Sequence, residues 1–314
     1  MQYRIGIDLG GTTIKAGVVD ETHRIICSHQ QPTVEGFEIV VADMAETARF
    51  AAEKVGLEWD DFSSVGVGSP GFVNPHTGLL VLSSNTNWRN MPLKQELQKH
   101  IPLPIFIEND ANCAVIGEMI AGAAKGYRHV LMLTLGTGVG GGLIIDGHLF
   151  SGGDSMGTEL SHTPLIAGGE QCTCGQKGCL EAYASVTALI RQTKEAMKES
   201  PETLMHSHVE KYGDVSGRTA FDCAREGDAV AMRVVDQYCT YLANGIGGFI
   251  TIFRPELVLL GGGLSDAGDT LLEPVRRKIE KYVFAGDIIG VPLIERAALG
   301  NDAGTIGAAY LGDM

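Results

Sequence analysis

The sequence predicts an α/β protein built from two halves of related topology, with a ligand cleft between them. The first observation is a repeat, because residues 3–20 and 129–146 both read as an apolar strand, a Gly-rich turn, a second apolar strand and an Asp turn. The second is a short apolar run at 105–107 that passes into a helical pattern, as in parallel α/β units. A chain of 314 residues, 44% of them hydrophobic, is long enough for two domains.

The first half is expected to open with a β-meander. Its strands are predicted at Arg4 to Leu9, Ile14 to Val19 and Arg24 to His29. Apolar residues at helical spacing then predict a helix from Phe37 to Val55. A buried strand is expected at 64–68. The Pro/Asn/Gly-rich segment that follows, up to Trp88, is interpreted as irregular and exposed, with room for one short strand at 79–82.

The second half is expected to repeat this beginning and then to become helical. A Cys-rich loop follows the repeat, and helical patterns cover Leu180 to Ser200 and Asp228 to Phe253. A strand at 257–260 leads into three consecutive glycines. The small apolar residues 303–311 predict a last helix that packs back on the first half.

Composition excludes some partners. With 24 basic and 38 acidic residues the net charge is −14, which argues against nucleic acid or an anionic membrane as the main partner and favours a small ligand. The N-terminus lacks the pattern of a signal peptide, and no apolar segment reaches the roughly 18 to 20 residues that span a bilayer. We therefore expect a cytoplasmic protein, whose seven cysteines are thiols or metal ligands rather than disulfides.

A polar group stands where the strand at 105–107 gives way to a helix. It consists of Glu108, Asn109 and Asp110. Ligands bind at the carboxyl ends of strands in parallel α/β proteins, so Asp110 is a candidate general base and Asn109 a candidate hydrogen-bonding partner. Asn and Asp are also the favoured N-caps, and this stretch alone leaves capping and catalysis equally open.

Two Gly-rich turns offer contacts to phosphate. The first contains Gly10, Gly11 and Thr12, and the second contains Thr137 and Gly138. Backbone N–H groups and Thr hydroxyls in such turns suit phosphate oxygens, although either turn alone could be an ordinary hairpin. Neither turn has the sequence of a Walker A loop or of a Rossmann dinucleotide motif.

Three further residues are candidates for binding a nucleotide or its Mg²⁺ ion. Asp8, beside the first turn, is placed to hold a hydrated Mg²⁺ ion, and its alternative role is to cap the turn. Gly262 and Gly263 follow the strand at 257–260 and allow a close approach that suits a flat adenosine group.

The Cys-rich loop predicts a metal site. Cys172, Cys174 and Cys179 lie within eight residues among glycines, and His162 completes a Cys₃His set of the kind that binds zinc tetrahedrally. Zinc is favoured over unpaired thiols, and with four protein ligands it would be structural. The other cysteines stand singly in apolar patterns and are expected in the core.

Taken together, these motifs resemble the ROK sugar kinases, within the actin-like ATPase superfamily, over essentially the whole chain. The matching segments are 8–12 (first phosphate motif), 108–112 (catalytic motif), 135–140 (second phosphate motif), 261–263 (adenosine motif) and 172–181 (zinc signature). The resemblance implies a two-domain actin-like ATPase (ribonuclease H-like) fold. Residues 1–115 and 299–314 would form the small domain, and residues 116–298 the large domain with the zinc loop.

The resemblance also implies an activity, namely ATP-dependent phosphorylation of a hexose at its 6-hydroxyl, with glucose as the foremost substrate. ATP, Mg²⁺ and a structural Zn²⁺ would take part, and Asp110 would be the base. The residues implied to contact sugar hydroxyls are Asn109, Asp110, Glu159, His162 and Glu181. The family implies a homodimer or a dimer of dimers. One departure is Ser161, where the family usually has glycine; if that position needs positive φ, Ser161 is strained.

Alternatives stay open within this resemblance. A kinase of N-acetylmannosamine, or of another hexose or N-acetylhexosamine, would use the same machinery. ROK transcriptional repressors carry a helix-turn-helix before the first strand, whereas Ile5 here already belongs to that strand. Because the nucleotide turns lie far from the Cys-rich loop in the chain, we expect loss of the metal to weaken sugar binding much more than ATP binding.

Overall fold

The computed structural model describes residues 3–83 and 87–314, and the chain divides into two compact units. The first unit comprises Met1–Met132, Gly141–Thr158 and Ala297–Met314, and the second comprises Leu133–Gly140 and Glu159–Arg296. The domain boundaries predicted from the sequence, with residues 1–115 and 299–314 in one domain and residues 116–298 in the other, stay a prediction.

A five-stranded sheet, with the strand order β3-β2-β1-β4-β8, forms the centre of the first unit. Its strands are β1 (Tyr3–Leu9), β2 (Thr13–Val19), β3 (Ile25–Pro32), β4 (Phe62–Ser69) and β8 (Ile105–Asn109). β1, β2 and β3 form the predicted antiparallel meander, and β4 and β8 continue the sheet parallel to β1. The predicted strands of this half are confirmed.

The segment after β4 is more ordered than the sequence suggested. It forms a separate antiparallel sheet of β5 (Phe72–Asn74), β6 (Leu79–Ser83) and β7 (Trp88–Met91), followed by α2 (Leu93–Leu97). The short strand expected at 79–82 is present as β6. Val73 of β5 is buried, so the prediction that the other described residues are irregular and exposed was wrong; residues 84–86 lie outside the described residues. The turn-forming residues that prompted it lie between very short strands; Gly71 and Gly78, for example, have positive φ.

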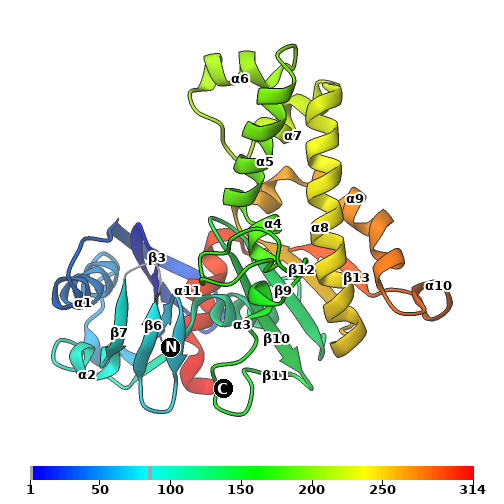
Figure 1. The fold of residues 1–314 in the computed structure, drawn as a ribbon. Coiled ribbons are helices and arrows are strands. Elements are labelled where there is room, and N and C mark those ends of the chain that lie inside the picture. Colours follow the sequence, from blue (N-terminus) through cyan, green and yellow to red (C-terminus); the bar gives the residue numbers. More distant parts are fainter. Residues whose placement is uncertain (1–2, 84–86) are drawn as a thin grey trace. The chain divides into compact units, whose positions relative to one another are not determined.

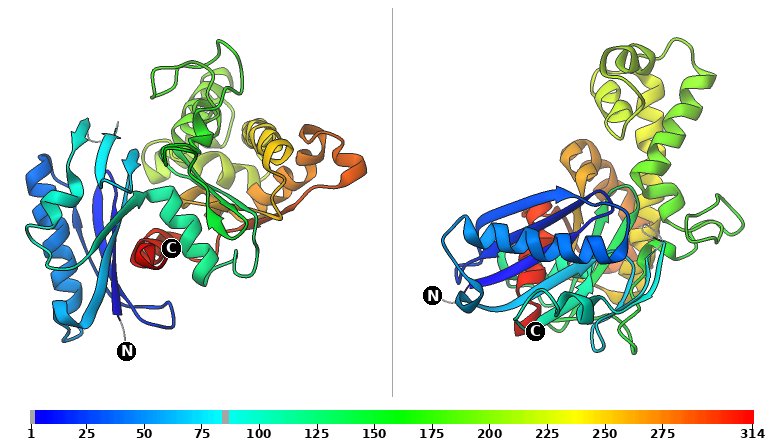
Figure 2. Two further views of the ribbon diagram at one scale, coloured as in Figure 1. Left: turned by 90° about the horizontal axis from the view of Figure 1, so that it is seen from below. Right: turned by 90° about the vertical axis from the view of Figure 1, so that its left-hand side faces the viewer.

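Helices cover both faces of the first sheet, α1 (Phe37–Glu53) on one and α11 (Ala303–Ala309) on the other (Figure 2). The helix predicted at Phe37 to Val55 and the last helix packing on the first half are both confirmed. The face toward α11 is lined by glycine. A Cβ on Gly6 would lie 1.8 Å from the Thr305 carbonyl oxygen, and one on Gly66 would lie 1.7 Å from that of Ala308. Glycine is what lets α11 lie directly on these strands.

α3 (Asp110–Ala121) follows β8 and packs closely against α11. Its Glu118 is fully buried, and the carboxylate accepts hydrogen bonds from the backbone N–H groups of Ala123, Ala298 and Leu299 at 2.8, 3.1 and 2.7 Å. A buried carboxylate with three such donors is well satisfied. Glu118 thereby fixes the segment that leads into α11, a role that the sequence analysis did not identify.

A second five-stranded sheet has the order β11-β10-β9-β12-β13. Its strands are β9 (Val130–Leu135), β10 (Val139–Ile145), β11 (His148–Leu149), β12 (Leu257–Gly261) and β13 (Leu293–Arg296). The predicted strand-turn-strand repeat and the strand at 257–260 are confirmed. β13, which pairs in parallel with β12 at the end of the strand order, was not predicted.

The second unit contains most of the helices labelled in Figure 1. They are α4 (Glu181–Ala184), α5 (Val186–Glu199), α6 (Met205–Tyr212), α7 (Thr219–Arg225), α8 (Ala229–Phe253), α9 (Asp269–Ile279) and α10 (Gly286–Ile289). α8 packs against α5, α7 and α9. The helical pattern at Leu180 to Ser200 is interrupted at Ser185, whose hydroxyl caps α5 by accepting from the Ala188 N–H at 3.1 Å. Within the described residues, no helix is both long enough and apolar enough to cross a membrane.

Candidate functional site

Three parallel strands of the first sheet end side by side, and residues near their ends form a row. β1 pairs with β4 through Asp8 and Gly68, and β4 pairs with β8 through Gly68 and Glu108. Because residues in one row of a sheet point to the same face, the two acidic side chains share a face with glycine between them. Carboxylates therefore gather at the carboxyl end of the sheet, where parallel α/β proteins bind ligands.

Asn109 and Asp110 stand where β8 passes into α3, and they divide the two roles that the sequence left open. The Asn109 side-chain oxygen accepts from the N–H groups of Ala111 and Asn112 at 2.9 and 3.2 Å, so Asn109 is the N-cap. Its amide nitrogen donates to the Gly71 carbonyl at 3.1 Å. Asp110 is the half-buried first residue of the helix. The cap thus belongs to Asn109, and Asp110 keeps its candidacy as a base.

Burial is the main influence on the pKa values at the carboxyl end of the first sheet. Burial raises the pKa of Glu108 above its ordinary value. It also raises the pKa of Asp8, against the opposing positive charge of Lys15. The buried Cys113 thiol has a raised pKa, first because of burial and then because of the charges of Glu108, Asp8 and Asp110. These three carboxylates therefore converge on one place in the first unit.

The first Gly-rich turn connects β1 and β2 next to Asp8. Thr33 holds it from the side, since its N–H donates to the Thr12 carbonyl at 3.0 Å and its hydroxyl donates to the Gly10 carbonyl at 2.8 Å. Gly11 and Thr12 are exposed. The turn therefore presents accessible backbone on a fixed frame, as a phosphate-binding turn requires.

The second Gly-rich turn, with Thr137 and Gly138, connects β9 and β10 and is closed by a backbone hydrogen bond of 3.0 Å onto Gly138. Gly262, beside Gly263, approaches it from the end of β12. Gly262 has a φ of 77°, and a Cβ there would lie 2.5 Å from the Leu135 carbonyl oxygen. Both the backbone conformation and the close approach require glycine. The predicted phosphate and adenosine turns of the second unit are therefore neighbours.

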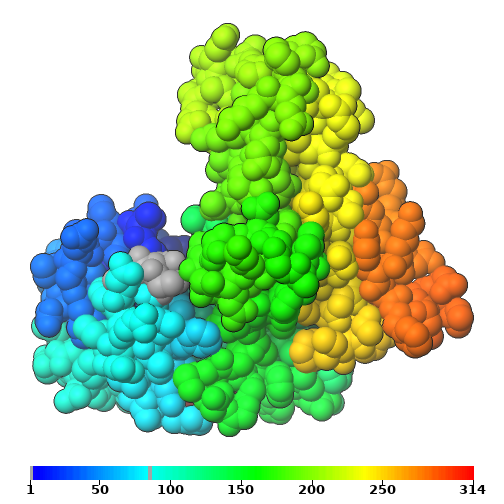
Figure 3. Space-filling view, viewed as in Figure 1, coloured from blue at the N-terminus to red at the C-terminus, as the bar shows by residue number. Residues whose placement is uncertain are grey.

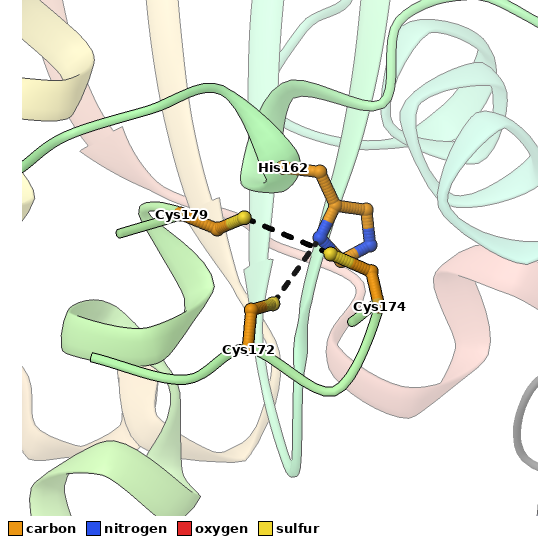
Figure 4. Close-up of side chains that lie close together, drawn as sticks. All are labelled: His162, Cys172, Cys174 and Cys179. Atoms are coloured by element: carbon orange, nitrogen blue, oxygen red, sulfur yellow. Dashed lines mark hydrogen bonds between the residues drawn. The ribbon is translucent and has the colours of Figure 1, made fainter. Parts of the chain in front are cut away.

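The predicted metal ligands come together, as Figure 4 shows. The ligand atoms of His162, Cys172, Cys174 and Cys179 all lie within 4.8 Å of one another. Cys172 Sγ is 3.6 Å from His162 Nδ1, and Cys174 Sγ is 3.7 Å from Cys179 Sγ. Four donors placed tetrahedrally at about 2.0 to 2.3 Å from a zinc ion would lie roughly 3.5 to 3.8 Å apart. Both the donor types and their spacing can hold a metal ion.

Two acidic residues lie near this cluster. Burial raises the pKa of Glu159; the charge of His162 opposes the rise, and that of Glu181 adds to it. The intervening Ser161 is buried in the short 3₁₀ helix Leu160–His162. Among the described residues, those with positive φ other than glycine include Thr158 but not Ser161. Serine therefore fits here with an ordinary backbone, and the strain considered for this position does not arise.

The structure thus gathers the predicted residues into one group in each unit. The first unit holds Asp8, Gly10, Gly11, Thr12, Asn109 and Asp110. The second holds Thr137, Gly138, Glu159, His162, Cys172, Cys174, Cys179, Glu181, Gly262 and Gly263. Three threonines that the sequence analysis missed, Thr33, Thr173 and Thr187, hydrogen-bond to these groups. Only Thr173, between two of the cysteines, had a position that could have drawn attention to it.

Comparisons with known proteins agree with this geometry. The model of the ROK family matches residues 4–313. Over 98% of this chain and 96% of its own length, the glucokinase of Thermotoga maritima is 39% identical, and that of Halalkalibacterium halodurans is 36% identical over 99% and 94%. A solved structure, a ROK family glucokinase from Streptomyces griseus in complex with glucose and AMPPNP, is 34% identical with a TM-score of 0.88 over 98% of both chains. This likeness confirms the predicted α/β fold of the two-domain actin-like ATPase type. The chain belongs to the ROK family.

Proposed function

We propose that this protein is an ATP-dependent sugar kinase that phosphorylates glucose at its 6-hydroxyl. The observation that carries the proposal is the full-length similarity to glucokinases, one of them solved with glucose and AMPPNP. The two groups of residues described above support it, because they supply a candidate base, Gly-rich turns suited to phosphate and a Cys/His loop that can hold a metal.

Asp110 is proposed as the general base. Phosphoryl transfer depends mainly on positioning and charge neutralisation, and the proton of the attacking hydroxyl needs an acceptor within about 2.6 to 3.2 Å. Asp110 sits on the first turn of α3, where its Oδ1 shares the Ala111 N–H with the N-cap Asn109, and Asn109 alone accepts from the Asn112 N–H. We propose that Asn109, Glu159, His162 and Glu181 join Asp110 in binding sugar hydroxyls. One hydrogen of the Asn109 amide group stays available after the bond to Gly71.

The nucleotide is proposed to bind at the three Gly-rich turns. Gly10, Gly11, Thr12, Thr137 and Gly138 would contact phosphates, and Gly262 and Gly263 would contact adenosine. Asp8, a half-buried carboxylate at the edge of the first turn, would hold Mg²⁺ through water. When bound, Mg²⁺ neutralises charge on the terminal phosphates.

The metal of the Cys/His loop is proposed to be zinc in a structural role. His162, Cys172, Cys174 and Cys179 would fill all four positions of a tetrahedral ion, which leaves none for a substrate. Reduced cysteines of this kind suit a cytoplasmic location, which we also propose.

We further propose that the protein is a homodimer, or a dimer of such dimers. An apolar patch on the second unit supports this proposal. It consists of Ile252, Phe284, Ile288, Ile289 and Leu293, with exposed fractions of 53% to 80%. Its members are linked, since Phe284 N–H donates to Thr251 Oγ1 and the Arg254 guanidinium donates to the Ile289 carbonyl. The segment around α10 lies at the surface in Figure 3, where it is orange. Apolar patches of this kind on proteins usually mark interfaces.

A panel of sugars in an ATP-consumption assay tests the function. Glucose should support turnover best, with lower kcat/KM for mannose, fructose, N-acetylglucosamine and N-acetylmannosamine. Product analysis should place the phosphate on the 6-hydroxyl. If glucose is not phosphorylated while an N-acetylhexosamine is, the substrate proposal is wrong and the alternative kinase reading replaces it. ATP consumption with none of these sugars would contradict the kinase proposal itself.

A further inference from the structure

Glu181 touches both the metal loop and the second phosphate turn. We infer that it is a positioning residue through which the loaded metal loop shapes that turn, so that the metal strengthens nucleotide binding as well as sugar binding. This role rests on the kinase function proposed above and adds to it a coupling between the two ligands. All of the residues involved belong to the second unit.

One oxygen of the Glu181 carboxylate faces the turn. Oε2 accepts a hydrogen bond from the Val139 N–H at 3.1 Å, and a Cβ placed on Gly138 would lie only 2.5 Å from it. Gly138 does not have positive φ, so the close carboxylate is the contact that a larger residue there would disturb, by displacing the Glu181 side chain. The phosphate turn and the glutamate are therefore fitted to each other.

The other oxygen faces the metal loop. Oε1 accepts from the Thr173 hydroxyl at 2.6 Å, and Thr173 stands between the two ligands Cys172 and Cys174. Along the chain, Glu181 itself follows the ligand Cys179 by two residues. A metal ion that holds all three cysteines would fix both ends of this contact. The direction of the buried Glu181 side chain thus depends on an ordered metal loop.

A second connection runs through the short helix α4. The start of α5, which follows α4, is hydrogen-bonded to the turn. Val186 N–H donates to the Gly136 carbonyl at 2.9 Å, and the Thr187 hydroxyl donates to the Thr137 carbonyl at 2.7 Å. Tyr238 of α8 anchors the end of α4 by donating to the Ala184 carbonyl at 2.6 Å. The turn is therefore held by a segment that begins at the last metal ligand.

These contacts change the expectation, based on distance along the chain, that loss of the metal weakens sugar binding much more than ATP binding. The second turn lies far from the Cys-rich loop in the sequence, yet it hydrogen-bonds to Glu181, the residue two positions beyond Cys179. Removing the metal frees the loop, and Glu181 then loses the constraint that aims it at Val139. Nucleotide binding should therefore weaken along with sugar binding.

The test measures binding of AMPPNP with Mg²⁺ by calorimetry in the absence of sugar. Thr173→Val keeps every metal ligand and nearly the same volume but removes the hydroxyl that holds Glu181. We expect its Kd for AMPPNP to rise about 3- to 10-fold, the effect of one lost hydrogen bond, with metal content unchanged by elemental analysis. Folded, metal-free wild-type protein, checked by circular dichroism, should show a rise at least as large.

Two further variants distinguish an effect on the phosphate turn from a general effect of replacing threonine by valine. Thr187→Val loosens the turn without touching the metal loop, so AMPPNP binding should weaken while glucose binding does not. Thr240→Val is the matched control, because the Thr240 hydroxyl donates within its own helix, to the Asp236 carbonyl at 2.8 Å. It should leave both affinities unchanged.

The outcomes distinguish this role from the kinase proposal. If the wild-type protein does not bind AMPPNP, the kinase proposal and the coupling fall together. If it binds AMPPNP, but the metal-free protein binds it equally well, the coupling alone is overturned and the metal loop serves the sugar only. If Thr173→Val itself loses metal, the comparison of loaded and metal-free wild-type protein decides.

Discussion

At the scale of single residues, Asp110 offers the most direct test of the mechanism. Asp110→Asn keeps the size of the side chain and leaves the helix cap to Asn109, but it removes the proton acceptor. We expect kcat to fall by roughly 10²- to 10⁴-fold while glucose affinity changes much less. Steady-state kinetics together with calorimetric glucose binding check this. Turnover close to that of the wild type would remove Asp110 from the role of base.

Glu108 predicts a dependence of stability on pH. Burial raises its pKa above the ordinary 4.5, so the folded protein holds this proton more tightly than the unfolded chain does. The stability of the wild type should therefore fall, through this group, as the pH rises from about 4.5 through the raised pKa. Both hydrogen bonds to the carboxylate, from Asn112 and from Asn109 N–H, end on Oε1. A glutamine carbonyl could accept both.

We therefore expect the stability of Glu108→Gln, relative to the wild type, to increase with pH. Denaturant unfolding between pH 4.5 and pH 8 measures the difference, and the exposed Glu21→Gln serves as control. A difference that stays constant across this range would show that Glu108 does not carry the buried charge.

Residue roles were predictable where chemistry is local in the sequence. The metal set needed only the spacing of Cys172, Cys174 and Cys179 with His162 upstream, because three thiols in a short loop have few other uses. The contact between Glu181 and Val139 could not be predicted, since it joins residues 42 positions apart and depends on how β10 and α4 pack. The φ of Ser161 was equally beyond reach, because backbone conformation there is set by the surrounding loop.

At the scale of elements, two helical glycines should respond in opposite ways to alanine. A Cβ on Gly117 of α3 would lie 2.2 Å from the Ala303 carbonyl oxygen, whereas one on Gly248 of α8 meets nothing within 4 Å. Gly117→Ala should destabilise by about 1 to 3 kcal/mol, because α11 must move away. Gly248→Ala should stabilise by roughly 0.5 to 1 kcal/mol, since alanine restricts the unfolded chain.

Thermal and denaturant unfolding of the two variants, in parallel with the wild type, give the comparison. Because the substitution and the helical setting are the same, propensity alone predicts a gain at both sites. A Gly117→Ala protein as stable as the wild type would mean that α3 and α11 are not packed this closely.

Elements with strong periodicity were predictable, and short ones were not. α1 and α8 present long apolar patterns at helical spacing, and the β1–β2 and β9–β10 units are apolar strands joined by glycine turns. β5 and β7 are three and four residues long, too short for a period to show, and only β6 of this sheet was expected. Their order comes from packing of residues such as Val73 and Leu80, which overrides the turn-rich composition.

At the scale of the whole molecule, the apolar patch around α10 predicts the state of association. Phe284 and Ile288 are each 80% exposed. Replacing both with serine should convert the dimer to a monomer, as measured by light scattering during size-exclusion chromatography. Tyr212→Ser is the control, since Tyr212 is also exposed, at 64%, but belongs to α6. A doubly substituted protein with the mass of the wild type would place the interface elsewhere.

The glycine face of the first sheet also bears on how the protein is made. Gly6 lies in β1 and Gly66 in β4, whereas α11, which covers both glycines, is synthesised much later along the chain. At about 5 to 20 residues per second, the ribosome needs roughly 15 to 60 seconds to synthesise the stretch from Leu9 to Ala303. For nearly all of that time the nascent sheet lacks the helix that seals it. These strands must therefore wait, uncovered on one face, until α11 has been synthesised, and this interval is where nascent-chain chaperones would have most to protect.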